Sequence, residues 1–345
     1  MPFPVKPHAA GLELTLACPC HCTTCGSRAG KSRGDELTTQ EWLTVIDELW
    51  ALGCRRLSFL GGEPLLFRDW PRLADAAVAL GFVVEMITSG MGVDEAVAKR
   101  IRDAGLVSVT VSVDGLATTH DTQRGIPGCH AQALRAIALL DAAGLKVGVN
   151  TQVNRATLPD LEAMAPILQD AGAMGWQWQL TMPRGRASDQ NDLILPPDRM
   201  LEVHALVVRL QQRHGLRPHI TDNLGYCTKD DTILRTNQGG FPSPWVGCMA
   251  GLYGIGITSD GFVKGCLALP DSAREGNLRD EPLSTIWNDP NRFAYNRAYS
   301  PTTLSGPCAT CPEGTRCRGG CNATALTFHG RTGTSSHCFR LHGVG

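Results

Sequence analysis

The sequence predicts an α/β fold: a partial, TIM-like (β/α)6 barrel followed by a small cysteine-rich domain. Apolar, strand-like runs alternate with amphipathic helical runs from residue 12 to about residue 183. A glycine separates helix from strand in five of these steps. From residue 248 the chain is rich in cysteine and glycine, and such segments need cross-links such as disulfides or bound metal to fold. We therefore expect a barrel (1–213), a connector rich in Gly, Pro and Asn (214–247) and a C-terminal domain (248–345).

The strand-like runs are near-continuous apolar segments, as expected of strands buried in a parallel sheet. Six strand–helix units are too few for a closed eight-stranded barrel. We therefore expect an open barrel with its active site at the carboxyl ends of the strands. The runs cover residues 12–17, 56–60, 83–88, 108–113, 147–153 and 176–182.

The helical runs carry their own start and stop signals. Thr38 and Glu41 have the spacing of a capping box, and apolar residues follow at helical period. Further helices are expected near residues 69–80, 93–104, 130–143, 157–171 and 197–213. The glycines expected just past the helix ends are Gly53, Gly81, Gly105, Gly144 and Gly172. Repeated steps of this kind favour right-handed βαβ units.

Composition and charge exclude several classes of function. The formal net charge of -1 offers no electrostatic footprint for nucleic acid. No apolar run approaches the roughly 18–20 residues that span a membrane, and the first residues lack the apolar core of a signal peptide. We expect a cytoplasmic protein that binds neither nucleic acid nor membrane. In that compartment the 14 cysteines favour metal binding over disulfides.

Cys18, Cys22 and Cys25 stand in the spacing C-x3-C-x2-C directly after the first strand-like run. Three thiolates on so short a loop can hold three irons of a 4Fe–4S cubane. The fourth iron then has no protein ligand from this motif and is open for chemistry. Taken alone, the three cysteines would also suit half of a zinc site. Cys20 lies inside this spacing, and we expect it not to be a ligand.

Further motifs at the predicted strand ends resemble those of the radical S-adenosylmethionine (SAM) enzymes. That resemblance implies that the Gly-Gly-Glu-Pro segment binds the SAM amino group, that Ser112 and Asp114 line its ribose and methionine portions, and that Arg124 pairs with its carboxylate. It also implies reductive cleavage of SAM to a radical that abstracts hydrogen from an unactivated C–H bond. The sequence departs from the pattern at Thr24, where an aromatic residue is usual. The expected SAM-binding residues are Gly61, Gly62, Glu63, Pro64, Ser89, Ser112, Asp114, Arg124 and Asn150.

The C-terminal cysteines resemble the SPASM domain, which implies two auxiliary 4Fe–4S clusters and three clusters in all. One complete ligand set is expected to be Cys308, Cys311, Cys317 and Cys338. The other is expected to contain Cys248, Cys266 and Cys321 and needs a fourth ligand. Either Cys227 reaches in or that iron is open to water, another side chain or substrate. A structural zinc site is the alternative for these cysteines.

The resemblance implies a maturase of a ribosomally made peptide that forms a carbon–carbon or thioether crosslink or another side-chain oxidation. It further implies an external electron donor of the flavodoxin or ferredoxin type. Only 17 residues precede Cys18, so a separate leader-binding protein or the barrel surface would read a leader. The alternatives are action on a small molecule such as a porphyrin, peptide epimerisation with Cys129 as candidate hydrogen donor, and sulfatase-type maturation. The last is less expected, because Leu267 stands where those enzymes have an Asp and Asp271 is a weak substitute.

Overall fold

The computed structural model describes residues 5–235 and 244–344, so residues 236–243 of the expected connector lie outside it. The described strands form a single 10-stranded sheet in the order β10-β9-β8-β1-β2-β3-β4-β5-β6-β7. The strands from β8 through β1 to β7 in this order pair in parallel. The β8–β9 and β9–β10 pairs at the other end of the sheet are antiparallel. The strands are β1 (Ala9–Glu13), β2 (Arg56–Leu60), β3 (Val83–Thr88), β4 (Ser108–Ser112), β5 (Lys146–Val153), β6 (Gly175–Leu180), β7 (Pro218–Ile220), β8 (Gly254–Ile257), β9 (Phe262–Lys264) and β10 (Gly276–Asn277).

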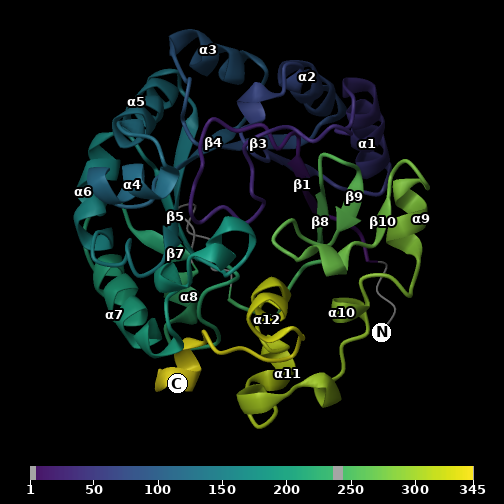
Figure 1. Ribbon diagram of the computed structural model, residues 1–345. Coiled ribbons are helices and arrows are strands. Elements are labelled where there is room, and N and C mark those ends of the chain that lie inside the picture. Colours follow the sequence, from purple (N-terminus) through teal and green to yellow (C-terminus); the bar gives the residue numbers. More distant parts are fainter. Residues whose placement is uncertain (1–4, 236–243, 345) are drawn as a thin grey trace.

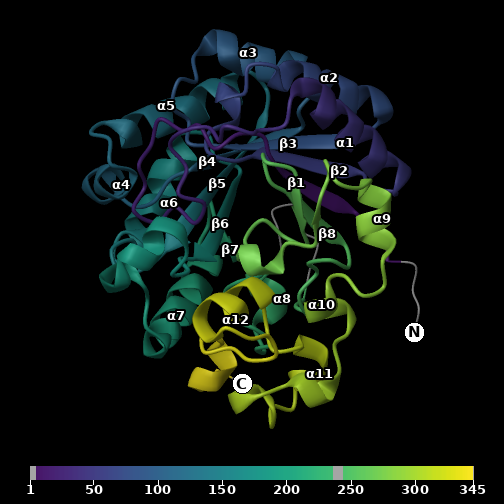
Figure 2. The same cartoon turned by 45° about the vertical axis from the view of Figure 1, so that its right-hand side comes forward.

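The sheet is curved and open, and this confirms the expected partial barrel. Figure 1 shows α1, α2, α3, α5, α6 and α7 around the outside of the sheet, whereas α11 and α12 lie between α7 and α10. Figure 2 shows the same placement from a second direction. The helices are α1 (Thr39–Ala51), α2 (Trp70–Leu80), α3 (Glu95–Asp103), α4 (Ala117–Arg124), α5 (Cys129–Ala142), α6 (Leu161–Asp170), α7 (Met200–Gln211), α8 (Asp231–Leu234), α9 (Leu283–Asn288), α10 (Ala294–Arg297), α11 (Gly314–Cys317) and α12 (Asn322–His329).

The helix signals in the sequence are confirmed. The Thr38 hydroxyl accepts the Glu41 backbone N–H at 3.2 Å, and the Glu41 carboxylate accepts the Thr38 N–H at 2.7 Å. All five glycines expected just past helix ends have the left-handed backbone that ends a helix. They are Gly53, Gly81, Gly105, Gly144 and Gly172. No helix in the described part of the chain is long and apolar enough to cross a membrane.

The sheet differs from the expectation at both ends. β1 ends at Glu13 rather than near residue 17, because the carbonyls of Thr15 and Ala17 accept the N–H groups of Gly62 and Glu63 instead of extending a ladder. β7 lies within the expected connector and pairs with β6, and β8 comes from the cysteine-rich part and pairs with β1. The division of the chain into three segments stays a prediction.

Candidate functional site

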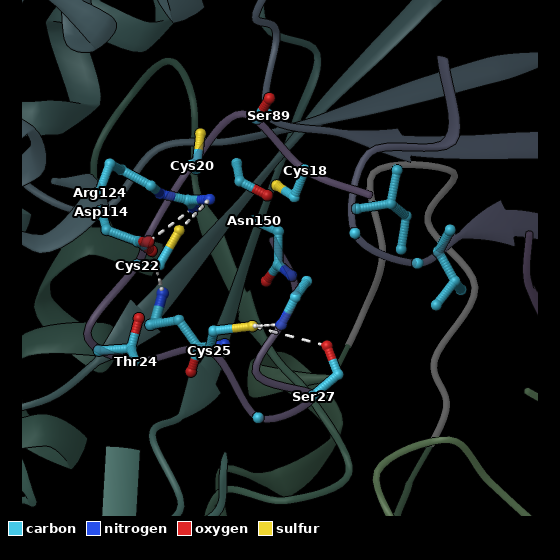
Figure 3. Close-up of a pocket in the computed structure, with 18 of the residues that line it drawn as sticks. Cys18, Cys20, Cys22, Thr24, Cys25, Ser27, Ser89, Asp114, Arg124 and Asn150 are labelled. Atoms are coloured by element: carbon cyan, nitrogen blue, oxygen red, sulfur yellow. Dashed lines mark hydrogen bonds and ion pairs between the residues drawn. The ribbon is translucent and has the colours of Figure 1, made fainter. Parts of the chain in front are cut away.

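A cavity of about 290 Å³ lies at the carboxyl ends of the parallel strands, where a barrel places its active site. The wall of this SAM-site cavity combines the loop after β1 with residues that end β2 to β6. Figure 3 shows the side chains of Cys18, Cys20, Cys22 and Cys25 around one space, with Asp114, Arg124 and Asn150 beside them. Of the expected site residues, the structure places these on the wall: Cys18, Cys22, Cys25, Gly61, Gly62, Ser89, Ser112, Asp114, Arg124 and Asn150.

The cysteine loop is fixed by backbone hydrogen bonds on both sides. The Cys18 N–H donates to the Gly30 carbonyl at 3.0 Å, and the His21 N–H donates to the Arg124 carbonyl at 3.1 Å. The Ala29 N–H donates to the Cys25 sulfur at 3.3 Å. These bonds hold the loop and the Cys25 sulfur beside the cavity.

Arg186 and Gly185 hold the same loop from the end of β6. The Arg186 side chain donates to the carbonyls of Cys22 at 2.8 Å and Ala29 at 2.7 Å, and its N–H donates to the Cys25 carbonyl at 2.9 Å. Gly185 has φ +58, and a Cβ there would overlap the Cys25 carbonyl. The Pro-x-Gly-Arg-Ala segment at 183–187 therefore positions the cysteine loop, a role that sequence reasoning did not assign.

The Gly-Gly-Glu-Pro segment lets two backbones approach closely. A Cβ on Gly61 would overlap the Thr15 carbonyl, and one on Gly62 would overlap the Ala17 carbonyl. Glu63 and Pro64 are not among the residues that line the cavity. Glu63 is buried behind the wall and accepts hydrogen bonds from the Thr88 hydroxyl at 2.7 Å and the Ser89 N–H at 2.8 Å.

Asp114 and Arg124 form a buried ion pair on the wall. An Arg124 guanidinium nitrogen lies 2.6 Å from an Asp114 oxygen and another lies 3.7 Å from the Cys22 sulfur. The second Asp114 oxygen accepts the Gln152 N–H at 2.8 Å. Burial lowers the pKa of His120 to about 4, so the neutral ring accepts the Asp114 N–H at 2.9 Å. Asp114 is thus held in one orientation from three sides.

Several wall atoms lack partners, which supports the fit of a polar cofactor. Buried atoms of Arg124 (Nε), Asn150 (Oδ1) and Arg186 (Nη2) have no hydrogen-bond partner among the described residues. A buried polar group without a partner is costly, so it indicates a ligand or water in the complete site. The cysteine side chains on the wall and these three atoms together suit an iron–sulfur cluster with SAM.

Cys20 is a site residue whose position the sequence did not predict. Its side chain is buried and lines the cavity with the three expected ligands. A hydrogen bond with Cys18 raises the pKa of the Cys20 thiol to about 11. Cys18 shows the opposite effect, since the same bond lowers its pKa. The expectation that Cys20 is not a ligand stays a prediction.

A second cavity of about 400 Å³ lies beside the first and is called the substrate chamber, after the role proposed for it below. Gln179 on β6 lines both cavities. The chamber is open to solvent along one side and also contains Asp222, Cys266 and Cys321 on its wall. The Asp222 side chain is exposed in the chamber, and desolvation by the surrounding wall raises the pKa of its carboxyl group. Its carboxylate has no hydrogen-bond partner among the described residues. Sequence reasoning missed Asp222 and Gln179.

The first auxiliary group is Cys248, Cys266 and Cys321. The Cys248 and Cys321 thiols hydrogen-bond, and this bond lowers the pKa of the Cys321 thiol. Cys266 and Cys321 face the substrate chamber. Cys227 does not join this group. It lies instead on the wall of the cavity that the second auxiliary group surrounds.

The second auxiliary group is Cys308, Cys311, Cys317 and Cys338, which line one small cavity. No three His, Cys, Asp or Glu side chains in the described ranges converge closely enough to hold a single metal ion. The ligands of one zinc ion all lie within about 2.3 Å of it, whereas a cubane needs thiolates spread around four irons.

Two other sequence candidates lie elsewhere. Cys129 starts α5, and its thiol donates to Asp121 at 3.4 Å rather than lining either cavity. Asp271 pairs with Arg274 at 2.8 Å, and its side chain is 64% exposed outside the chamber. Neither position suits a hydrogen donor or a base in the chamber.

Comparison with known proteins agrees with this geometry. The model of the radical SAM superfamily matches residues 12–163, and the model of the iron-sulfur cluster-binding SPASM domain matches residues 248–312. An AdoMet-dependent heme synthase of Methanosarcina barkeri is 29% identical over 332 residues, 94% of this chain and 93% of that protein. A PqqA peptide cyclase of Granulibacter bethesdensis is 29% identical over 323 residues, 92% of this chain and 83% of that protein.

Solved structures share the fold over nearly the whole chain. Streptococcus suis SuiB bound to its precursor peptide SuiA gives a TM-score of 0.72 at 14% identity, covering 97% of this chain and 75% of that one. The anSMEcpe structure with bound AdoMet and the Cp18Cys peptide gives 0.72 at 17% identity, covering 97% and 94%. At these identities the likeness establishes the arrangement of elements.

Proposed function

The chain belongs to the radical SAM enzymes and carries a C-terminal SPASM domain, and we propose that it is a maturase of a ribosomally made peptide. In this proposal it removes hydrogen from a side-chain carbon and joins that carbon to a second residue through a carbon–carbon or thioether bond. The names of its relatives and neighbours support a peptide substrate, since they include a peptide cyclase and two peptide-bound enzymes.

The observation that carries the proposal is that Gln179 lies on the wall of both the SAM-site cavity and the substrate chamber. A residue placed in the chamber is thus next to the SAM site on one side and to Cys266 and Cys321 on the other. The chamber opens to solvent, so an extended chain can enter and continue outside it. An open groove suits a segment of peptide better than a small molecule, which needs enclosure.

The chain's own residues bind and orient the reacting groups. When bound, the cluster at Cys18, Cys22 and Cys25 and its SAM supply a carbon-centred radical that removes hydrogen from a C–H bond. Gly61 and Gly62 let the loop after β1 pack closely against this segment, because a Cβ on either would overlap the carbonyl of Thr15 or Ala17. The ion pair of Asp114 and Arg124 fixes another part of the cavity wall.

Asp222 is the proton acceptor in this proposal. Its unpartnered carboxylate faces the chamber beside Cys266 and Cys321. Crosslinking removes one hydrogen atom from carbon and one proton from the partner group, and one electron leaves to an acceptor of the iron–sulfur class. The proton goes to Asp222, a carboxylate on the chamber wall. The imidazole of His219, whose pKa burial lowers, is another base in the described part of the same wall.

Asp222→Asn should lower crosslinked product about 10²-fold, since positioned general bases contribute about 10²–10⁴-fold. Formation of 5′-deoxyadenosine should stay within about 2-fold, because the SAM-site cavity is unchanged. The ratio of 5′-deoxyadenosine to product, measured by chromatography, therefore rises. Asp271→Asn is the matched control, since that carboxylate is exposed and ion-paired outside the chamber. Equal product from both variants would remove Asp222 from the mechanism.

The proposed function is tested with small peptides encoded beside the gene. Reconstituted enzyme, SAM and dithionite are incubated with each peptide, and mass spectrometry is used to look for a loss of about 2 Da, the mass of two hydrogens. Loss of two hydrogens with one 5′-deoxyadenosine per product supports a crosslink. SAM cleavage that no peptide stimulates, together with turnover of a tetrapyrrole, contradicts it.

A tetrapyrrole substrate is the second candidate, because heme synthases of three organisms are 27–29% identical to this chain. A tetrapyrrole with several carboxylates needs cationic partners. In the described lining of the chamber the cation is Arg235, and its guanidinium is committed to Asp231 and to the carbonyls of Thr221, Leu224 and Gly225. This wall favours the peptide. The same assay with an iron-containing heme precursor distinguishes the two substrates.

The proposal includes three 4Fe–4S clusters, a flavodoxin- or ferredoxin-type electron donor and a separate leader-binding protein. We also place the enzyme in the cytoplasm, where the thiols stay reduced. Anaerobic reconstitution should give about 12 iron and 12 sulfide per chain, from three cubanes of four irons each. Colorimetric iron and acid-labile sulfide assays measure both. About four of each, with zinc present, would mean that the C-terminal cysteines hold zinc instead.

A further inference from the structure

Five cysteines, rather than four, surround the cavity of the second auxiliary group. Cys227 lies on its wall with Cys308, Cys311, Cys317 and Cys338. Cys227 precedes the matched SPASM segment, which begins at residue 248. A cubane has four irons, and each accepts one thiolate beyond its three sulfides. One of the five thiols therefore has no iron of its own.

Cys227, the additional cysteine, lies next to Cys317. The Cys227 and Cys317 thiols lie within hydrogen-bonding range of each other. Both are buried, with 4% and 7% of their surfaces exposed. Two neighbouring thiols compete for the same corner of a cubane, because its four ligands spread around four irons.

The backbone at Cys227 is held in an uncommon conformation. Its φ is +51, in the left-handed region that few non-glycine residues adopt. Such strain persists only where surrounding contacts impose it, and it concentrates at functional sites. Arg235 binds the carbonyls of Leu224 at 3.0 Å and Gly225, and the Cys321 N–H donates to the Tyr226 hydroxyl at 3.2 Å.

We propose that Cys227 and Cys317 share one corner of the second auxiliary cluster, so that either thiolate can bind the corner iron while the other remains a hydrogen-bonded thiol. Cys308, Cys311 and Cys338 hold the other three corners. A thiol that donates to a ligating sulfur raises the reduction potential of a cluster. The pair thus gives this corner a spare ligand and a means to tune its potential.

The proposal is tested on the full-length, reconstituted protein with Cys227→Ala, Cys317→Ala, the double variant and Cys308→Ala. Each preparation is oxidised mildly with ferricyanide and desalted, and its iron is then counted. A cubane corner without a thiolate loses its iron on oxidation, so about one iron per chain disappears, or about four if the cluster breaks up. Formation of 5′-deoxyadenosine from SAM without substrate, expected within about 2-fold of wild type, checks that the barrel is intact.

Both single variants at the shared corner should retain as much iron as the wild type. The double variant and Cys308→Ala should each retain at least about one iron fewer, because each lacks a corner ligand. Cys317→Ser should retain as much iron as Cys317→Ala. Because serine is close to cysteine in size, this comparison separates the loss of a thiolate ligand from the loss of side-chain volume. Loss of iron in either single variant to the level of Cys308→Ala would overturn the proposal, as would a double variant with wild-type iron.

Discussion

Replacing Cys25 with alanine should abolish reductive SAM cleavage and leave both auxiliary clusters in place. Cys25 is one of three thiolates that the spacing assigns to the first cluster, and the Ala29 N–H already donates to its sulfur. The auxiliary groups lie in separate cavities, so their iron should be unaffected. We expect about four irons fewer per chain and 5′-deoxyadenosine formation below about 1% of wild type.

Cys20→Ala is the matched control, because Cys20 lies in the same loop and lines the same cavity. It should keep its full iron content and at least about half of the SAM cleavage rate, since the three assigned thiolates remain. Unchanged cleavage in Cys25→Ala would contradict the cluster assignment. If SAM cleavage were lost in Cys20→Ala but retained in Cys25→Ala, Cys20 rather than Cys25 would be the cluster ligand.

The barrel and the gathering of several expected residues around one cavity were predictable, because the carboxyl ends of parallel strands converge. Ser89, Asp114 and Asn150 belong to three different strand ends, yet all line one cavity. Once the strand–helix alternation was recognised, their convergence followed from topology alone. Glu63 shows the limit of this reasoning. It belongs to the right motif, but its carboxylate binds Thr88 and Ser89 behind the wall.

The far ends of the sheet could not be predicted from local pattern. β7 has three residues and begins with Pro218, and β8 has four residues, two of them glycine. Neither segment is long enough for an alternating or apolar signal. Their pairing with β6 and β1 depends on tertiary contacts, and the β8 partner is far away in the chain.

Asp222 was missed for the same reason. Asp222 follows β7 as Asp114 follows β4, so an unrecognised strand concealed a strand-end carboxylate. The signal that could have found it is the polar run from Thr221 to Asn223 after a short apolar segment. Cys227 carried no such signal. Its neighbour Cys317 is 90 positions away, and a folded loop with a left-handed residue is what joins them.

Gly185→Ala should disable the first cluster although residue 185 is not a ligand. A Cβ at this position would overlap the carbonyl of Cys25 and lie 2.5 Å from that of Gly26. The alanine can fit only if the cysteine loop moves, and a displacement of about 1 Å at a reacting centre costs about 10²-fold in rate. We expect SAM cleavage to fall by about 10²-fold while the auxiliary clusters keep their iron.

The positive φ of Gly185 adds a cost that must be separated from the overlap. Gly92 has φ +77 and nothing within 4 Å of a Cβ, so Gly92→Ala carries the backbone cost without the steric one. The unfolding free energy of that control should fall by about 1–2 kcal/mol. Its rate of SAM cleavage at 25 °C should equal that of the wild type. Equal activity in the two variants would mean that the loop accommodates the methyl group. Loss in Gly185→Ala alone would establish that the segment after β6 positions Cys25 through backbone contact, because no side-chain ligand has been removed.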